Sequence, residues 1–274
     1  MGQDVKRPRS PDLLAVCTHN PQVRCQDCRL NSICLPLALE AGDIDHLDRI
    51  IQRGRPLQRN THLYREGEPF NSVYAVRSGA VKTYRTTDKG REQVTGFYLP
   101  GEILGLDGIA DSLHYSAAVA LETSAVCEIP FEALARLGQN MPRLQRHFLR
   151  LMSREIGDEQ QLISLLGKNS ATERIVALLL SLSSRNARRQ LSATRFRLPM
   201  SRSDIGNHLG LTVETVSRTF TRLQRDQLIL VDNREVELLD PGALSVILTG
   251  EQDPGLPLRE TSCYRQKRQA MPTL

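Results

Sequence analysis

The sequence predicts an α+β fold, in which an N-terminal β-barrel or jelly roll precedes a long helix and a C-terminal winged helix-turn-helix. Short strand-like runs separated by glycine turns occupy about 57–129. An apolar repeat at helical spacing covers about 142–167. Two short helical patterns joined by a glycine occur within about 201–223. With 274 residues, of which 40% are hydrophobic, the chain can form about two domains with cores of their own.

The first part of the chain combines a cysteine-rich loop with the strand-like region. Residues 1–24 are polar and contain several prolines, which favours a flexible arm. Residues 25–35 form the cysteine loop, and 43–51 has apolar residues on one side of a helix. Asp88-Lys89-Gly90 is a turn signal. Strand-like runs at 73–76 and 80–84 lie on either side of Arg77-Ser78-Gly79. We therefore expect one domain over 25–140, made of this loop and a β-roll.

A single long helix is expected over 141–168. Its apolar stripe recurs in steps of three and four residues, which is the heptad pattern of two helices packed along a seam. The positions of this stripe are Leu149, Met152, Ile156, Glu159, Ile163 and Leu166. Glu159 is the only charged member of the stripe, and in a homodimer it would face its own copy. The alternative is a helix packed on its own barrel, with Glu159 pointing to water.

Residues 169–249 are expected to form a winged helix-turn-helix domain. Ser201 can cap the first helix of the motif, and Gly210 supplies the tight turn after it. Residues 231–238 have the pattern of the wing hairpin. The tail from 250 to 274 is rich in Pro, Arg and Gln and is expected to be disordered.

The second helix of the motif, over 213–223, has the pattern of a DNA recognition helix. Thr212 can cap it, and its apolar side should be buried. That apolar side consists of Val216, Phe220 and Leu223. The outward residues, which suit base edges in the major groove, are Glu214, Ser217, Arg218 and Thr221. Further along the helix, Arg222 and Arg225 suit phosphates. The stretch 185–225 holds nine arginines and two acidic residues, which predicts a phosphate-binding surface, with an ordinary solvated face as the alternative.

Four cysteines form the strongest chemical signal in the chain. Cys25, Cys28 and Cys34 lie within ten residues, and Cys127 lies far downstream in a strand-like segment. Thiolates are soft ligands that suit iron–sulfur clusters or zinc, and the spacing alone leaves both open. Cys127 taken by itself could also be a buried apolar thiol.

Several classes of protein are excluded by what the sequence lacks. No run of residues approaches the length of a membrane span, and the start has no apolar segment typical of a secretory signal, so we expect a cytoplasmic protein without membrane association. In that compartment, grouped cysteines favour metal or redox chemistry over structural disulfides. No phosphate-binding loop, nucleophile elbow or metal-binding pair of histidines occurs, so we do not expect an enzyme.

The pattern as a whole resembles the cyclic-AMP receptor protein superfamily and, within it, the fumarate and nitrate reductase regulators. The resemblance covers about 25–248. The motifs that carry it are Cys-x2-Cys-x5-Cys at 25, 28 and 34, Leu-Glu-Thr-Ser-Ala-Val-Cys-Glu-Ile-Pro at 121–130, and Leu-Thr-Val-Glu-Thr-Val-Ser-Arg at 211–218. Two departures from the family are Arg29, next to the second cysteine, and the upstream Cys17.

The resemblance implies an oxygen-sensing transcriptional activator of anaerobic metabolism. It implies that the four cysteines hold an oxygen-labile 4Fe–4S cluster, which promotes homodimerisation and DNA binding. It implies that Glu214, Ser217 and Arg218 read a palindrome resembling TTGAT-N4-ATCAA, that Glu159 is a switch in the dimer helix, and that the loop at Gly90 contacts RNA polymerase. The alternative is a related regulator with a structural zinc or a thiol-redox site.

The same resemblance raises the question of cyclic-nucleotide control. The barrel of the superfamily has a nucleotide pocket, in which an arginine and a serine bind the phosphate. Here the corresponding stretch is His114-Tyr115-Ser116, which has no arginine. Because a bidentate guanidinium is what suits the phosphate, we expect no cyclic nucleotide to bind.

Overall fold

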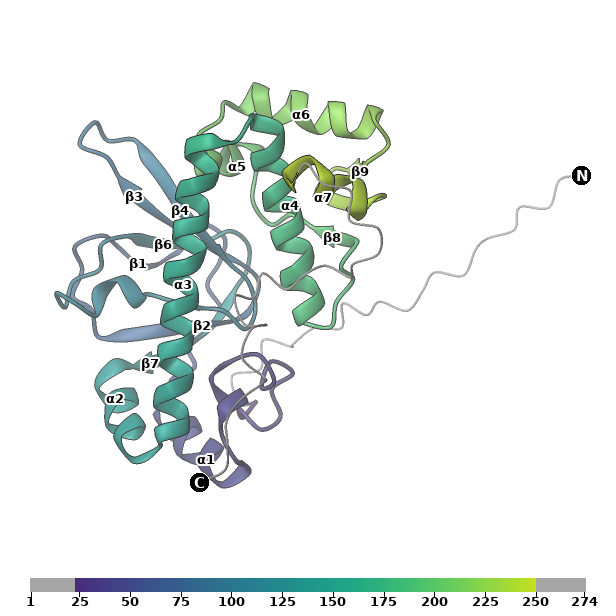
Figure 1. The fold of residues 1–274 in the computed structure, drawn as a ribbon. Helices are drawn as coiled ribbons and strands as arrows, with labels where there is room; N and C mark the ends of the chain where they lie inside the picture. Colours follow the sequence, from purple (N-terminus) through teal and green to yellow (C-terminus); the bar gives the residue numbers. More distant parts are fainter. Residues whose placement is uncertain (1–22, 250–274) are drawn as a thin grey trace, which may run out of the picture. The chain divides into compact units, whose positions relative to one another are not determined.

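The computed structural model describes residues 23–249, which form two compact units (Figure 1). The first unit consists of 23–82 and 97–148, and the second of 83–96 and 149–249. The sequence of elements has the predicted α+β order, so the predicted fold class is confirmed. The predicted arm and tail, together with Cys17 and Cys263, lie outside the described residues.

The first unit is built around two antiparallel layers of short strands. One sheet has the order β1-β6-β3-β4 and the other β5-β2-β7. The strands are β1 (His62–Tyr64), β2 (Ser72–Ser78), β3 (Val81–Thr86), β4 (Glu92–Tyr98), β5 (Ile103–Leu104), β6 (Ala117–Ala120) and β7 (Ala125–Pro130). The strand β2 continues through Arg77, which the sequence placed in a turn. The turn itself falls at Gly79, where a Cβ atom would lie 2.3 Å from the Ser124 hydroxyl.

Strands β2 and β7 are covered on both faces, and this arrangement positions the cysteines. Tyr74, Val76 and Val126 pack into the core inside the barrel with Tyr64 and Leu104. Because side chains alternate along a strand, the residues between them project from the opposite face. On that opposite face, Ala75 is paired with Cys127 across the two strands.

Short helices cover the outer face of this sheet. The helical turn η1 (Leu35–Ala38) follows the cysteine loop, and α1 (Ala41–Ile50) follows η1. A further turn, η2 (Leu106–Gly108), lies between β5 and β6. Helix α2 (Phe131–Asn140), which the sequence analysis missed, packs against α1 and β7 (Figure 1). The long helix α3 (Pro142–Lys168) has nearly the predicted bounds.

The second unit contains the helix-turn-helix and its wing. Its elements are α4 (Ala171–Arg188), β8 (Arg195–Arg197), α5 (Arg202–Leu209), α6 (Val213–Arg225), β9 (Ile229–Asp232), β10 (Glu235–Leu238) and α7 (Pro241–Thr249). The wing is a three-stranded antiparallel sheet in the order β8-β10-β9. In Figure 1, α5 and α6 lie side by side with α4 below them.

The tip of the β3–β4 hairpin also belongs to the second unit, because it is hydrogen-bonded to α5. The side-chain amide of Asn207 accepts from the backbone N–H of Val94 at 2.5 Å and donates to the carbonyl of Glu92 at 2.7 Å. The Nδ1 atom of the neighbouring His208 lies 3.2 Å from the Val94 carbonyl. Because a carbonyl oxygen accepts, Nδ1 is the donor in this bond, and burial lowers the pKa of His208 below its usual value.

Candidate metal centre and nucleic-acid interface

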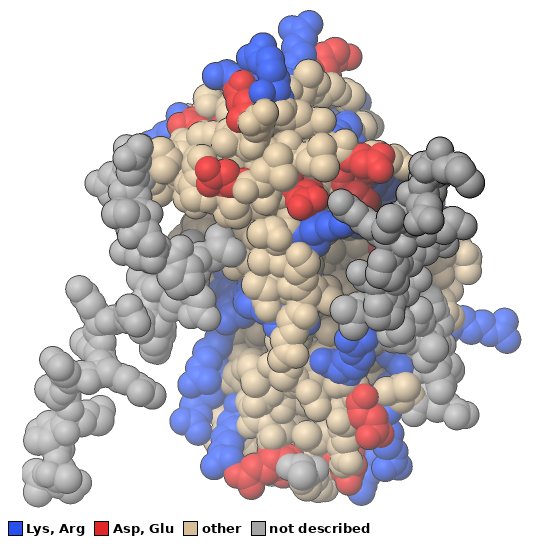
Figure 2. Space-filling model, turned by 90° about the vertical axis from the view of Figure 1, so that its right-hand side faces the viewer, with Lys and Arg blue, Asp and Glu red and all other residues tan. Residues whose placement is uncertain are grey.

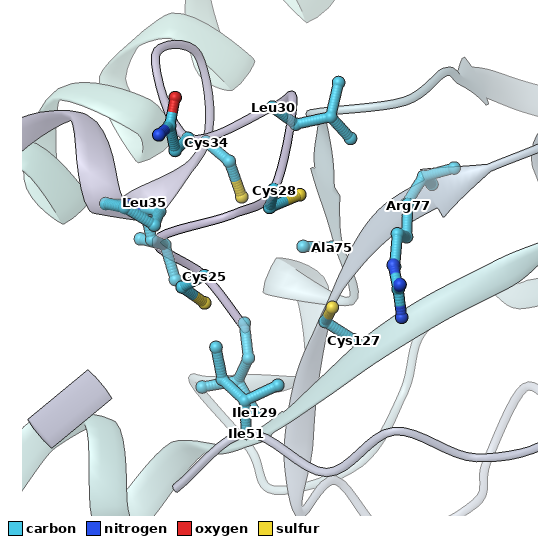
Figure 3. A pocket seen from close by; sticks show the side chains of 13 residues that line it. Cys25, Cys28, Leu30, Cys34, Leu35, Ile51, Ala75, Arg77, Cys127 and Ile129 are labelled. Atoms are coloured by element: carbon cyan, nitrogen blue, oxygen red, sulfur yellow. The ribbon is translucent and has the colours of Figure 1, made fainter. Parts of the chain in front are cut away.

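The four cysteines predicted as ligands line one pocket. Cys25, Cys28 and Cys34 come from the loop before η1, and Cys127 comes from β7. Figure 3 shows their sulfur atoms placed around a common space between the loop and the strands. Apolar side chains form most of the remaining wall: Leu30, Leu35, Ile51, Ala75 and Ile129. The spacing of the cysteines in the sequence did not show that Cys127 lies with the other three. The fold brings all four to one pocket.

Local backbone structure holds the cysteine loop in shape. Its turns are closed by hydrogen bonds from Cys28 N–H to the carbonyl of Cys25 and from Cys34 N–H to the carbonyl of Leu30, at 3.3 and 2.9 Å. Cys34 is then the N-cap of η1, whose second residue is Pro36. A proline suits this position because the first turn of a helix does not need its N–H. The loop therefore brings three thiols to the strand that carries Cys127.

Burial disfavours the thiolate form of three cysteines of this pocket, namely Cys25, Cys34 and Cys127. Burial raises the pKa of Cys34 to about 12. Burial also raises the pKa of Cys25, and the carboxylate of Asp48 adds to the effect. For Cys127, burial raises the pKa against the opposing charges of Arg53 and Arg77. Because a metal binds thiolates, loading the site must release protons.

Three charged residues beside the pocket were missed by sequence reasoning. Asp48 accepts the Cys25 N–H at 2.8 Å and a guanidinium N–H of Arg53 at 2.5 Å. The same Nη2 atom of Arg53 lies 3.5 Å from the Cys25 sulfur. Arg77 is 6% exposed and lines the pocket on the Cys127 side (Figure 3). No spacing signal could have found them, since Asp48 and Arg53 meet Cys25 from 23 and 28 residues away.

A single metal ion and an iron–sulfur cluster need different spacings of four thiols. Four thiolates around one zinc at about 2.3 Å would hold their sulfurs about 3.8 Å apart. Within 23–249, no three His, Cys, Asp or Glu side chains are grouped closely enough for one metal ion. Four thiols that line one largely apolar pocket are the donor set of iron–sulfur clusters. Beside Cys25, the buried Nε–H of Arg53 has no hydrogen-bond partner among the described residues. The residues present therefore fit a 4Fe–4S cluster in kind.

The helix-turn-helix is fixed by caps at both of its helices, as predicted. The Ser201 hydroxyl accepts from the N–H of Asp204 at 3.0 Å, and the Asp204 carboxylate accepts the Ser201 N–H at 2.9 Å. Gly210 ends α5 at φ +64°, which a glycine adopts without strain. Thr212 accepts from the N–H of Thr215 at 3.2 Å and so begins α6.

Helix α6 has a buried face and a basic outer face. Val216, Phe220 and Leu223 are buried, as predicted from their spacing. The guanidinium carbon of Arg202 lies 3.3 Å from the centre of the Phe220 ring, which joins α5 to α6. On the outer face, a shallow hollow is lined by Ser217, Arg218, Thr221, Arg222 and Arg225. Figure 2 shows basic side chains gathered over α6, at the top of the view.

The acidic member of this outer face is also exposed. The carboxylate of Glu214 lies in the first turn of α6, and hydrogen bonds from its own backbone N–H and from Thr212, together with Arg218, hold its pKa below the usual range. An ionised carboxylate is the form that accepts from the amino group of cytosine. All the residues predicted to contact DNA are therefore exposed on one helix.

The apolar stripe of α3 is uncovered in the single chain. Leu149, Ile156 and Ile163, which are seven residues apart, are 54%, 54% and 70% exposed. Met152 is partly buried, and Glu159 is exposed between the apolar positions. Separately, Gly90 lies exposed in the turn between β3 and β4, at φ +71°.

The barrel stretch at His114 makes its polar contacts within the protein. The His114 ring stacks on Tyr64 with centroids 3.7 Å apart, and its Nδ1 atom lies 3.4 Å from the Asp107 carboxylate. The other carboxylate oxygen of Asp107 accepts from the N–H and the hydroxyl of Ser116 at 2.9 and 2.7 Å. His114 and Ser116 are thus both engaged with the Asp107 carboxylate.

Comparison with known families and proteins covers both units. Residues 54–141 match the cyclic nucleotide-binding domain family, and 173–247 match the Crp-like helix-turn-helix domain family. The transcriptional activator protein anr of Pseudomonas aeruginosa is 52% identical over 84% of this chain and 95% of its own length. The fumarate and nitrate reduction regulatory protein of Vibrio cholerae is 45% identical over 81% of this chain and 89% of its own length.

A solved structure agrees with these relatives. FixK2 from Bradyrhizobium japonicum matches with a TM-score of 0.67 at 30% identity, covering 72% of this chain and 97% of its own. No helix within 23–249 has both the length and the apolar character needed to cross a membrane. From its two domain matches and its close relatives, the chain belongs to the FNR/Anr group of Crp-type transcriptional regulators.

Proposed function

We propose that this protein is an oxygen-responsive transcriptional activator of anaerobic metabolism. In this proposal Cys25, Cys28, Cys34 and Cys127 hold a 4Fe–4S cluster, α3 pairs with its copy in a homodimer, and α6 reads the DNA. The observation that carries the proposal is the single pocket lined by all four thiols, in a chain whose other unit is a helix-turn-helix. The names of the relatives, among them an anaerobic regulator in Haemophilus influenzae, support the same reading.

The residues of the pocket provide four cysteine ligands and a largely apolar wall. A bound 4Fe–4S cluster would supply a centre that reacts with oxygen. Through the cluster, the four cysteines would join two segments that lie far apart in the chain, namely the loop before η1 and strand β7. The apolar wall limits access of water to the site. Retention of a cluster would then depend on the loop before η1 staying packed against β7.

The α3 stripe provides the dimer surface in this proposal. Exposed apolar residues seven apart are the pattern of a coiled-coil seam, and their burial against a second copy would be favourable. Glu159 opposes that association, because two like charges facing each other cost free energy. Burial of the stripe and repulsion at Glu159 thus act in opposite directions, and in this proposal ordering of the cysteine loop shifts the balance towards the dimer.

The outer face of α6 provides the reader. Glu214, Ser217 and Arg218 would contact bases of a palindrome resembling TTGAT-N4-ATCAA, with Thr221 on the same outward face, while Arg222 would contact its backbone. Two half-sites about 34 Å apart require a dimer. Gly90, in the exposed hairpin turn, is proposed to contact RNA polymerase. The internally engaged Asp107, His114 and Ser116 support a regulator that does not use a cyclic nucleotide.

Anaerobic purification tests the proposal. We expect iron and acid-labile sulfide in equal amounts, an iron–sulfur absorption band, and binding of the palindrome that is lost in air. Cys127→Ser should abolish all three, whereas Cys17→Ser and Cys263→Ser serve as matched controls and should retain them. A Cys127→Ser protein with a full complement of iron and sulfide would contradict the ligand set. Stoichiometric zinc in place of iron would favour the alternative of a structural zinc site.

A further inference from the structure

A charged pair beside the cysteine pocket has no role in the function proposed above. Asp48 is on α1, and Arg53 follows three residues after that helix ends. Their side chains are 16% and 14% exposed. The two groups form an ion pair at 2.5 Å, with one guanidinium nitrogen directed at the Asp48 carboxylate.

The backbone places Arg53 between the two cysteine-bearing segments. The preceding residue, Gln52, forms an antiparallel bridge with Glu128, with N–H to carbonyl distances of 2.8 and 2.9 Å. Glu128 is next to Cys127, so Arg53 is held at the strand that carries this thiol. On its other side, Arg53 lies 3.5 Å from the sulfur of Cys25.

One donor of this buried guanidinium is unused. The Nε–H of Arg53 is buried and has no hydrogen-bond partner among the described residues. Leaving a buried charged donor unpaired is costly, so such an atom usually has a partner in the functional state. The oxygen acceptor beside the guanidinium, Asp48 Oδ1, is bonded to Nη2, and the same nitrogen lies 3.5 Å from the Cys25 sulfur. The partner that this position suits is therefore a sulfur atom.

We propose that Arg53 is a positioning residue that donates its Nε–H to a sulfur of the bound centre and protects that centre from oxidation, with Asp48 holding the guanidinium in place. This inference rests on the proposed function, since it requires a cluster on the four cysteines. Hydrogen bonds to sulfur and local charge are among the factors that set the reduction potential of such clusters. If a bound centre gave one electron to molecular oxygen, superoxide would leave and the centre would lose negative charge beside a fixed cation. Arg53 makes that transfer less favourable.

The Asp48→Asn substitution distinguishes two explanations, because they predict opposite changes in the rate of oxidation. If only the net charge near the pocket mattered, Asp48→Asn would leave more positive charge and slow oxidation. If Asp48 acts by orienting Arg53, the same substitution releases the guanidinium and accelerates oxidation. Its Oδ1 atom accepts from both Cys25 and Arg53, so an asparagine retains an acceptor while losing the charge that holds the pair.

The experiment compares anaerobically loaded wild-type protein with Arg53→Gln, Arg53→Lys and Asp48→Asn. After confirming equal iron and sulfide, the decay of the cluster absorbance is followed on adding air-saturated buffer, and the reduction potential is measured by dye-mediated titration. We expect about tenfold faster decay and a lower potential for Arg53→Gln, since loss of a hydrogen-bond partner of a metal ligand costs about 10- to 100-fold in metal affinity or activity. Arg53→Lys should fall between it and wild type, and Asp48→Asn should also decay faster.

Arg49→Gln is the matched control, because Arg49 is exposed on α1, the helix that carries Asp48, and the substitution removes the same charge as Arg53→Gln. It should leave both measurements at the wild-type value. Equal decay rates and potentials in Arg53→Gln and wild type would overturn the inference while leaving the proposed function intact, and so would an equal effect of Arg49→Gln. If Arg53→Gln does not load, the same comparison is decided by Arg53→Lys and Asp48→Asn. A wild-type protein without iron and sulfide would overturn the proposed function and this inference together.

Discussion

Arg218 and Arg222 lie four residues apart on the outer face of α6, yet they should affect DNA binding in different ways. Arg218 is in the N-terminal half of the helix, where outward side chains reach base edges. A bidentate contact to guanine is worth about 1–3 kcal/mol of discrimination. A dimer places two copies of Arg218 on a palindrome, so Arg218→Ala should cost about 2–6 kcal/mol, or roughly 30-fold to 10⁴-fold in specificity.

Arg222→Ala is the matched comparison. Its guanidinium is 63% exposed and lies 3.6 Å from the Asp226 carboxylate, an exposed ion pair that is weak and can be exchanged for a phosphate. Each phosphate contact contributes about 0.9 to the slope of log K against log salt, so a dimer of Arg222→Ala should lose about 1.8. Its ratio of specific to non-specific affinity should remain at the wild-type value.

Fluorescence anisotropy with a labelled duplex measures both quantities. Anaerobic protein is titrated into the palindrome and into a scrambled duplex at several salt concentrations. Arg218→Ala should lower the ratio of the two affinities, and Arg222→Ala should lower both affinities together. The assignment of α6 as the reader is refuted if Arg218→Ala binds the two duplexes in the wild-type ratio.

Three further predictions concern the switch and stability. Glu159→Ala should make the cluster-free protein dimerise at lower concentration, because the facing charges are removed; sedimentation that finds an unchanged monomer fraction would mean that this residue does not face its copy. Ser201→Ala should destabilise α5 by about 1 kcal/mol in thermal unfolding, through loss of a helix cap, and no shift would argue against the cap. Burial pushes the pKa of Asp107 up, but hydrogen bonds from His114 and Ser116 lower it below its usual value. The stabilisation of the folded state by ionised Asp107 is therefore full above the unfolded pKa of about 3.9 and is lost as the pH falls through the folded pKa. Asp107→Asn should accordingly lose less stability than wild type as the pH is lowered through this range, measured by thermal unfolding.

Local and periodic features of the chain could be predicted from its sequence. The long helix, the caps at Ser201 and Thr212 and the buried face of α6 depend on residues close together in the chain, and all are present. Helix α2 was missed although Phe131, Leu134 and Leu137 have helical spacing, because it is short and directly follows a strand that ends in a proline.

The surroundings of the cysteines could not be predicted in the same way. Cys127 and the N-terminal thiols come together only when β7 pairs with β2 and the loop packs on their outer face. The pair of Asp48 and Arg53 depends on that packing as well as on the bridge between Gln52 and Glu128. Contacts between residues so far apart in sequence leave no periodic trace, and a charged pair looks like ordinary surface composition until its burial is known.

The hydrogen bonds between Asn207 and the hairpin affect how the DNA-reading part can be isolated. A fragment that starts at residue 149 would lack 83–96, which supplies the backbone partners of the Asn207 amide and the carbonyl bonded to His208. Such a fragment would expose both side chains and is expected to be less stable than its length suggests. A preparation of this unit must therefore also supply 83–96, for example as a separate peptide that restores these bonds.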